Sequence, residues 1–113
     1  MKKYEIVKKN YDFNDIINTG SYLKNPYYYI YYKVSNSNFP KFGLAVSKKC
    51  GNAVERNRIK RRLRSIIDSN KELFSSHYDF IILTRKNIGT ISYQEMEYYL
   101  TTLIKKGNMN EKI

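Results

Sequence analysis

The sequence predicts an α+β fold: a two-layer sandwich in which helices pack on a small mixed sheet of about four strands. Apolar residues recur at helical spacing in some segments, and they alternate or run continuously in others. The expected order of elements is αβββαβα. A chain of 113 residues has the length of one domain and is too short for two, so we expect a single domain over residues 1–113.

The first and last helices are predicted from apolar spacing and end signals. The first should run from about Asp12 to Asn18, with Gly20 in the left-handed conformation after its last turn. The last should run from about Tyr93 to Lys106, because Ser92 and Glu95 have the spacing of a capping box ahead of an apolar stripe.

The middle helix is predicted to be amphipathic and to span residues 53–70. Gly51 and Asn52 lie just upstream, where they supply a permissive backbone and a capping amide. Four apolar residues fall within an arc of roughly 100° on the helical wheel, which should face the core. They are Ile59, Leu63, Ile66 and Ile67.

Three segments have the patterns of strands. Tyr27 to Val34 is rich in aromatic and branched residues, and Phe42 to Val46 alternates, so we expect these two strands to pair as an antiparallel hairpin. Tyr78 to Thr84 is a nearly continuous apolar run, as expected for an interior strand. A further short strand is expected near Lys2 to Lys8 or Lys48 to Gly51.

The net charge predicts a polyanionic partner. Lys and Arg number 21 against 10 Asp and Glu, which gives +11. Such a surplus attracts nucleic acid. An anionic membrane surface is the weaker alternative, because it would call for a basic amphipathic helix with Trp, Phe or Leu on its other face and the sequence lacks Trp. No apolar run approaches the ~20 residues of a bilayer span, so no membrane-spanning segment is expected. Without a secretory signal at its N-terminus, the protein is expected to be cytoplasmic, with no membrane partner.

Arginine is concentrated in one stretch of the chain. Five of the six arginines lie between Arg56 and Arg64, although lysine outnumbers arginine by 15 to 6 overall. Guanidinium binds phosphate oxygens in pairs and stacks on bases, so this clustering favours a nucleic-acid surface over an ordinary solvated face. The expected RNA-binding residues are Lys48, Lys49, Asn52, Arg56, Asn57, Arg58, Lys60, Arg61, Arg62 and Arg64.

Alternation divides the tyrosine-rich strand into two faces. The face that carries both aliphatic residues should face the core, and it comprises Tyr28, Ile30, Tyr32 and Val34. The open face, called the tyrosine face below, comprises Tyr27, Tyr29, Tyr31 and Lys33. Rings on an open face can stack on unpaired bases, at ~1–3 kcal/mol per base. The alternative is that these tyrosines are ordinary strand formers beneath a helix.

One continuous segment resembles a known signature. Residues 41–64 read KFGLAVSKKCGNAVERNRIKRRLR, with S-K-K-x-G-N-A-V from Ser47 to Val54 and R-N-R-x-K-R-x-x-R from Arg56 to Arg64. This segment resembles the signature of the bacterial ribonuclease P protein subunit. A K-x-x-D-F pattern from Lys9 to Phe13 extends the resemblance, which covers nearly the whole chain.

The resemblance implies the RNA-binding subunit of an endoribonuclease. Its implied partners are a catalytic ribonuclease P RNA and precursor tRNA, with no obligate protein partner. The RNA would use Mg²⁺ to remove the 5′ leader, so the protein itself would hold no catalytic residue and no tightly bound cofactor. A metal contact near Asn57 and a left-handed βαβ crossover are also implied by the resemblance.

The resemblance places the precursor leader in a cleft between the sheet face and the helices. Phe13 and Tyr31 match aromatic positions of the family. Ile17 stands where an aromatic residue is common and Pro26 where a basic residue is common, so stacking should depend more on Tyr29 and Tyr31. The expected cleft residues are Phe13, Ile17, Tyr29 and Tyr31.

Two other classes of protein compete with this interpretation. A structural RNA-binding protein, such as a ribosomal component, would share the charge and the sandwich but would not need the tyrosine face. A free-standing nuclease would need converging carboxylates or histidines, whereas the ten acids here are scattered. We expect His77 to lie in a surface loop and Cys50 to be a small buried hydrophobe.

Overall fold

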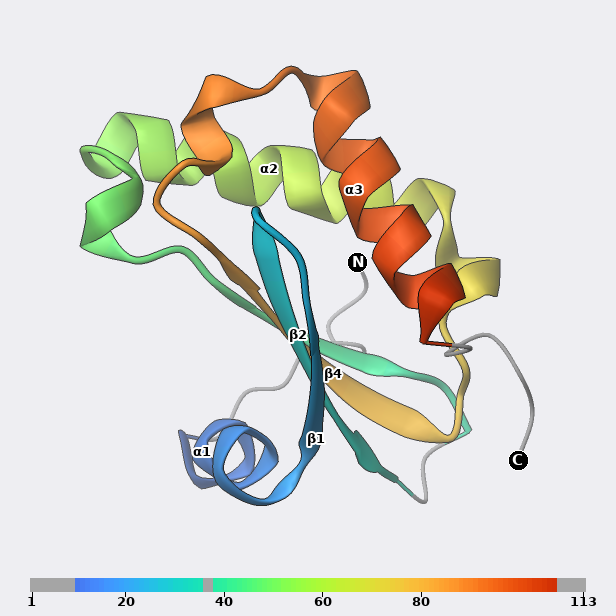
Figure 1. The fold of residues 1–113 in the computed structure, drawn as a ribbon. Coiled ribbons are helices and arrows are strands. Elements are labelled where there is room, and N and C mark those ends of the chain that lie inside the picture. The colour runs from blue at the N-terminus through green and yellow to red at the C-terminus, as the bar shows by residue number, and fades with distance from the viewer. Residues whose placement is uncertain (1–9, 36–37, 108–113) are drawn as a thin grey trace.

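The computed structural model describes residues 10–35 and 38–107 (Figure 1). The α+β class and the order αβββαβα are confirmed. The helices and strands are α1 (Asn10–Thr19), β1 (Ser21–Lys24), β2 (Tyr28–Val34), β3 (Lys41–Ala45), α2 (Ala53–Ser69), β4 (Tyr78–Thr84) and α3 (Tyr93–Lys106). Three short 3₁₀ turns accompany them: η2 (Lys48–Cys50), η3 (Lys71–Leu73) and η4 (Ile88–Thr90). No helix in the described part of the chain is long and apolar enough to cross a membrane.

The strands form one mixed sheet in the order β1-β2-β4-β3. The neighbours β1 and β2, and β2 and β4, are antiparallel, whereas β3 and β4 are parallel. The interior position of β4 is confirmed, because its residues Phe80, Ile81 and Ile82 are fully buried. The predicted hairpin between β2 and β3 is wrong, since β4 lies between them: a strand that is apolar on both faces is best accommodated inside the sheet.

The parallel pair β3 and β4 requires a crossover, and α2 provides it. This confirms a βαβ unit, while its left hand stays a prediction.

The additional strand is β1, at neither of the two predicted places. Residues 48–50 form η2 instead, and residues 2–8 lie outside the described part of the chain. Gly20, just before β1, has no left-handed backbone, so that prediction is also wrong. Its lack of a side chain serves a close approach, because a Cβ there would lie 2.5 Å from the carbonyl oxygens of both Ile16 and Tyr32.

The main core lies between one face of the sheet and the pair α2 and α3 (Figure 1). Tyr28 is fully buried in it, and its hydroxyl donates a hydrogen bond to the Met96 carbonyl at 3.0 Å. Burial raises the pKa of Tyr28 well above its ordinary value. The predicted core face of β2 is confirmed for Tyr28 and Ile30, and Tyr32 packs partly against the core. Val34 is 67% exposed at the end of the strand, so the core face stops before it.

The helix α1 packs on the opposite face of the sheet, against β2 and β4. Ile16 is buried there, and the ring of Phe13 lies close over Gly43 of β3. Lys33 of β2 links the sheet to the end of α1, because its ammonium group donates hydrogen bonds to the Asp15 carboxylate at 2.5 Å and to the Thr19 hydroxyl at 3.0 Å. The hydrogen bond from Lys33 lowers the pKa of Asp15.

Candidate nucleic-acid interface

The start of α2 is built by a glycine and a reciprocal cap. Gly51 has a φ of 135°, a conformation that favours glycine and turns the chain from η2 into the helix. The side-chain oxygen of Asn52 accepts a hydrogen bond from the Glu55 amide at 2.9 Å, and the Glu55 carboxylate accepts one from the Asn52 amide at 3.4 Å. This capping box fixes where the basic segment begins.

The predicted RNA-binding residues all lie on η2, on the cap or on α2, and together they are called the basic surface below. The buried side of α2 carries the four apolar residues predicted for it, which leaves the remaining directions to polar side chains. The exposed members are Lys48, Lys49, Asn52, Asn57, Arg58, Arg61 and Arg64, and the half-buried members are Arg56, Lys60 and Arg62. Arg56 is drawn toward the protein because its Nε donates to the Asn52 carbonyl at 3.4 Å.

A cavity of about 580 Å³ opens beside the basic surface. That volume is in the range of small-ligand pockets. Its lining residues come from β2, β3, β4, η2, α2 and the segments that follow β3 and β4, and several of them are apolar. Four cationic side chains line it: Lys49, Lys60, Arg85 and Lys86. The remaining lining residues are Tyr29, Leu44, Ala45, Val46, Ser47, Leu83, Thr84 and Asn87.

Arg85 connects this cavity to the tyrosine face. Its guanidinium carbon lies 5.1 Å from the centroid of the Tyr29 ring, within the range of a cation–π contact. The same guanidinium donates to the Asn25 carbonyl at 3.1 Å, and the Arg85 amide donates to the Tyr27 carbonyl at 2.8 Å. These three contacts hold a cation against one face of the cavity's aromatic ring.

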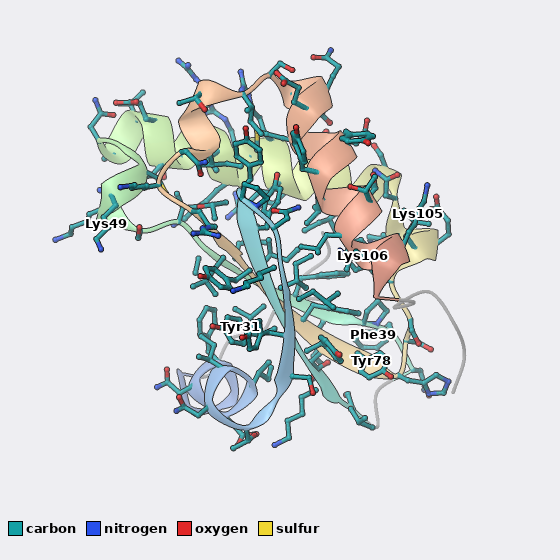
Figure 2. The ribbon with its side chains drawn as sticks, viewed as in Figure 1. Tyr31, Phe39, Lys49, Tyr78, Lys105 and Lys106 are labelled. Atoms are coloured by element: carbon teal, nitrogen blue, oxygen red, sulfur yellow. The ribbon has the colours of Figure 1, made fainter. Side chains whose placement is uncertain are left out.

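The four predicted cleft residues share the α1 side of the sheet but not one cavity. Tyr29 lines the cavity, whereas Phe13, Ile17 and Tyr31 are not among its described lining residues. Tyr31 continues the aromatic surface from Tyr29, with ring centroids 6.3 Å apart and planes 26° apart. Figure 2 shows Tyr31 on the side of the strands where α1 lies, with Lys49 projecting from η2 beyond it.

Tyr27 departs from its predicted place on the open face. It precedes β2, and its ring packs 4.6 Å from that of Tyr99 on α3. Tyr27 is therefore a structural residue at the rim of the core, as the alternative for these tyrosines allows.

Sequence reasoning missed the segment that follows β4, which contributes Arg85, Lys86 and Asn87 to the cavity. One signal was available, because Arg85 is the one arginine outside the cluster on α2. Nothing in the sequence pointed to Asn87, whose side-chain oxygen is buried without a hydrogen-bond partner among the described residues. Only the fold brings this segment beside Lys49 and Lys60.

The described residues contain no group of three or more His, Cys, Asp or Glu side chains placed to hold a metal ion. Cys50 is buried as expected, with its sulfur 3.4 Å from the Thr84 hydroxyl. His77 precedes β4, and its amide donates to the Ser75 hydroxyl at 3.2 Å, consistent with a loop residue.

Comparisons with known proteins agree with this geometry. A family model described as Ribonuclease P matches residues 1–108. The ribonuclease P protein component of Mycoplasma capricolum is 40% identical over 107 residues, covering 94% of this chain and 98% of the relative. That of Streptococcus pneumoniae is 40% identical over 118 residues, covering 99% and 96%.

Solved structures agree as well. The RNase P protein of Staphylococcus aureus superposes with a TM-score of 0.87 at 28% identity, covering 95% of this chain and 98% of that one. The RNase P protein of Thermotoga maritima superposes with a TM-score of 0.83 at 25% identity, covering 90% and 96%. The basic surface, the fold and these relatives lead to one conclusion: the chain belongs to the ribonuclease P protein family, whose members are the RNA-binding protein components of that endoribonuclease.

Proposed function

We propose that this protein binds two RNAs at once: the catalytic RNA through the basic surface and the 5′ leader of precursor tRNA through the cavity and the tyrosine face. In this proposal the RNA makes the cut with Mg²⁺, and the protein supplies affinity. Family membership does not favour a ribosomal role.

The character of the basic surface supports contact with a phosphate backbone. Its arginines and lysines lie on adjoining turns of η2 and α2, and most of them are exposed. Phosphate contacts release condensed counterions, so binding should weaken steeply with added salt. Because such contacts do not depend on base identity, this surface suits a folded RNA recognised by its backbone.

One observation carries the assignment of the leader: Tyr29 lies in a cavity wall among four cations, and Tyr31 extends its ring surface. Aromatic rings bind unpaired bases by stacking, with little dependence on sequence, and cations beside them bind the phosphates. A duplex hides its base faces, so this arrangement favours a single strand. The leader is the single-stranded part of the precursor that mature tRNA lacks.

In this proposal the RNA, and not the protein, binds the catalytic Mg²⁺. The scattered acids of the described chain support that division of labour. Asn57, which is exposed on α2, is the protein's candidate metal contact, and its lone amide suits an ion held chiefly by phosphates. Titration of Mg²⁺ into the protein alone should therefore give no saturable binding.

Reconstitution at low Mg²⁺ tests the division of roles. We expect the leader to be released efficiently only when the protein, the catalytic RNA and the precursor are together. Cutting without the RNA would identify a free-standing nuclease. No gain over the RNA alone would favour a structural RNA-binding protein.

Tyr31→Ala tests leader binding. It should lower affinity for precursor tRNA by ~1–3 kcal/mol and leave affinity for mature tRNA almost unchanged, because only the precursor has a leader. Tyr98→Ala is a matched control, since Tyr98 is 62% exposed on α3. Equal loss for precursor and mature tRNA would refute the leader assignment.

A further inference from the structure

We propose that the single-stranded path continues past Tyr29 and Tyr31 onto β1, where Tyr22 stacks against a further unpaired nucleotide. The inference deepens the proposed function and rests on it. It assigns a binding role to a strand that the sequence did not predict and to a tyrosine outside the cavity.

The three tyrosines form a connected aromatic surface across two strands. Tyr22 lies directly opposite Tyr31 in the register of β1 and β2. The Tyr22 ring centroid is 5.6 Å from that of Tyr31 and 6.3 Å from that of Tyr29. Tyr22 is 53% exposed, so a large part of its ring is open to a ligand.

Two cations lie beside the tyrosine rings. Lys24 lies two residues after Tyr22, on the same face of β1, and it is paired in register with Tyr29. Its side chain is exposed. Arg85 covers the cavity end of the tyrosine surface. The two cations therefore lie on either side of Tyr29, one on β1 and one after β4, where they can bind phosphates of a strand whose bases stack on the rings of Tyr29, Tyr31 and Tyr22.

The position of β1 in the fold does not require a ring at residue 22. Leu23, on the opposite face of the strand, packs against the core and lies so close to Gly107 that a Cβ added there would collide with it. Leu23 thus anchors β1 to the body of the protein. An exposed aromatic ring on the other face has a cross-strand contact but no core to fill.

Fluorescence provides a direct test, because the chain contains no tryptophan. Tyr22→Trp places a single indole at the proposed position, and Tyr98→Trp places one on an exposed site of α3. In the complex with the catalytic RNA, precursor tRNA should quench the indole on β1 more than mature tRNA does, because a stacked base quenches indole emission. The indole on α3 should respond equally to both. Equal responses of the β1 indole would overturn the inference.

Affinity measurements with leaders of graded length provide the second test. Tyr22→Ala should weaken binding of long-leader precursors about 5- to 20-fold, the lower part of the range for a stacked base, and should spare short-leader precursors. Tyr22→Phe should retain the affinity. A melting curve identifies any loss of fold in Tyr22→Ala, in which case the quenching of Tyr22→Trp by precursor over mature tRNA still decides whether the ring at this position contacts the leader.

The outcomes separate this inference from the proposed function. If Tyr29→Ala and Tyr31→Ala weaken precursor binding selectively but Tyr22→Ala does not, the path ends at β2 and the inference is wrong. If all three variants bind precursor and mature tRNA like the unmodified protein, the leader assignment itself fails. If Tyr22→Ala alone weakens precursor binding, and by the same factor for every leader length, Tyr22 has a structural role and the inference is wrong.

Discussion

Gly43 offers a test of how α1 is held over the sheet. A Cβ at this position would lie 2.9 Å from Cε2 of Phe13 and 2.5 Å from Cδ1 of Ile81. Both distances are shorter than real Cβ contacts, so Gly43→Ala must displace the Phe13 ring, the buried Ile81 side chain or both. Overpacking of this kind costs about 1–3 kcal/mol, of which about 0.5–1 kcal/mol is offset by removing a glycine from a strand.

The middle of these ranges leaves a net loss of roughly 1 kcal/mol, which corresponds to about 4 °C in melting temperature for a domain of this size. Thermal denaturation followed by circular dichroism measures it. Gly89→Ala is the matched control, since the nearest heavy atom to its added Cβ would be 3.9 Å away, an ordinary contact. The control should melt like the unmodified protein.

A double-mutant cycle identifies the contact responsible. With Phe13→Ala in the background, the added methyl at Gly43 no longer meets the Phe13 ring but still meets Ile81, so Gly43→Ala should cost less than it does alone. Gly43→Ala should also weaken precursor binding, because Phe13 belongs to the predicted leader cleft. The reasoning is refuted if Gly43→Ala melts like Gly89→Ala, or if its cost is the same in both backgrounds.

Three further predictions concern the basic surface and the core. Arg61 is exposed on α2, so Arg61→Ala should leave the melting temperature unchanged and reduce the slope of log affinity against log salt by roughly 0.7–0.9 per lost phosphate contact, measured by filter binding to the catalytic RNA. An unchanged slope would identify a merely solvated residue. Tyr28 is fully buried, so Tyr28→Ala should lower the free energy of unfolding by about 3–5 kcal/mol in urea titrations, and a loss below about 1 kcal/mol would contradict its place in the core. Because burial raises the pKa of Tyr28, the unfolded chain releases the phenolic proton first, and stability should fall as pH rises above about 10, a decline that Tyr28→Phe should reduce.

Local signals predicted the helices well. The capping box predicted at Ser92 is present, Asn52 caps α2 as predicted, and α3 runs from Tyr93 to Lys106 as its spacing indicates. A cap and an apolar stripe are properties of one short segment, so they can be found without knowledge of the rest of the chain. The tyrosine alternation succeeded for the same reason at Tyr28.

Long-range features were not accessible in this way. Strand order depends on competition between segments, and no pattern within residues 41–45 shows that β4 rather than β2 is their neighbour. β1 has four residues, most of them exposed, so it lacks the alternation that identifies a strand. Strand pairing also decides where Arg85, Lys86 and Tyr22 lie, because the sheet brings the segment after β4 and the strand β1 beside β2.

The strand order also has a consequence for how the chain folds as it is synthesised. β2 and β3 are separated by only residues 35–40, yet the native sheet needs β4, from residues 78–84, between them. During synthesis, β2 can pair at once with β1, but its other edge and β3 both lack their native partner β4, so a non-native hairpin between β2 and β3 is accessible. We expect that non-native hairpin to form transiently and to open when β4 arrives, which would make its opening a slow step. Nascent chains shorter than about residue 84 would lack the complete sheet face that we propose binds the leader.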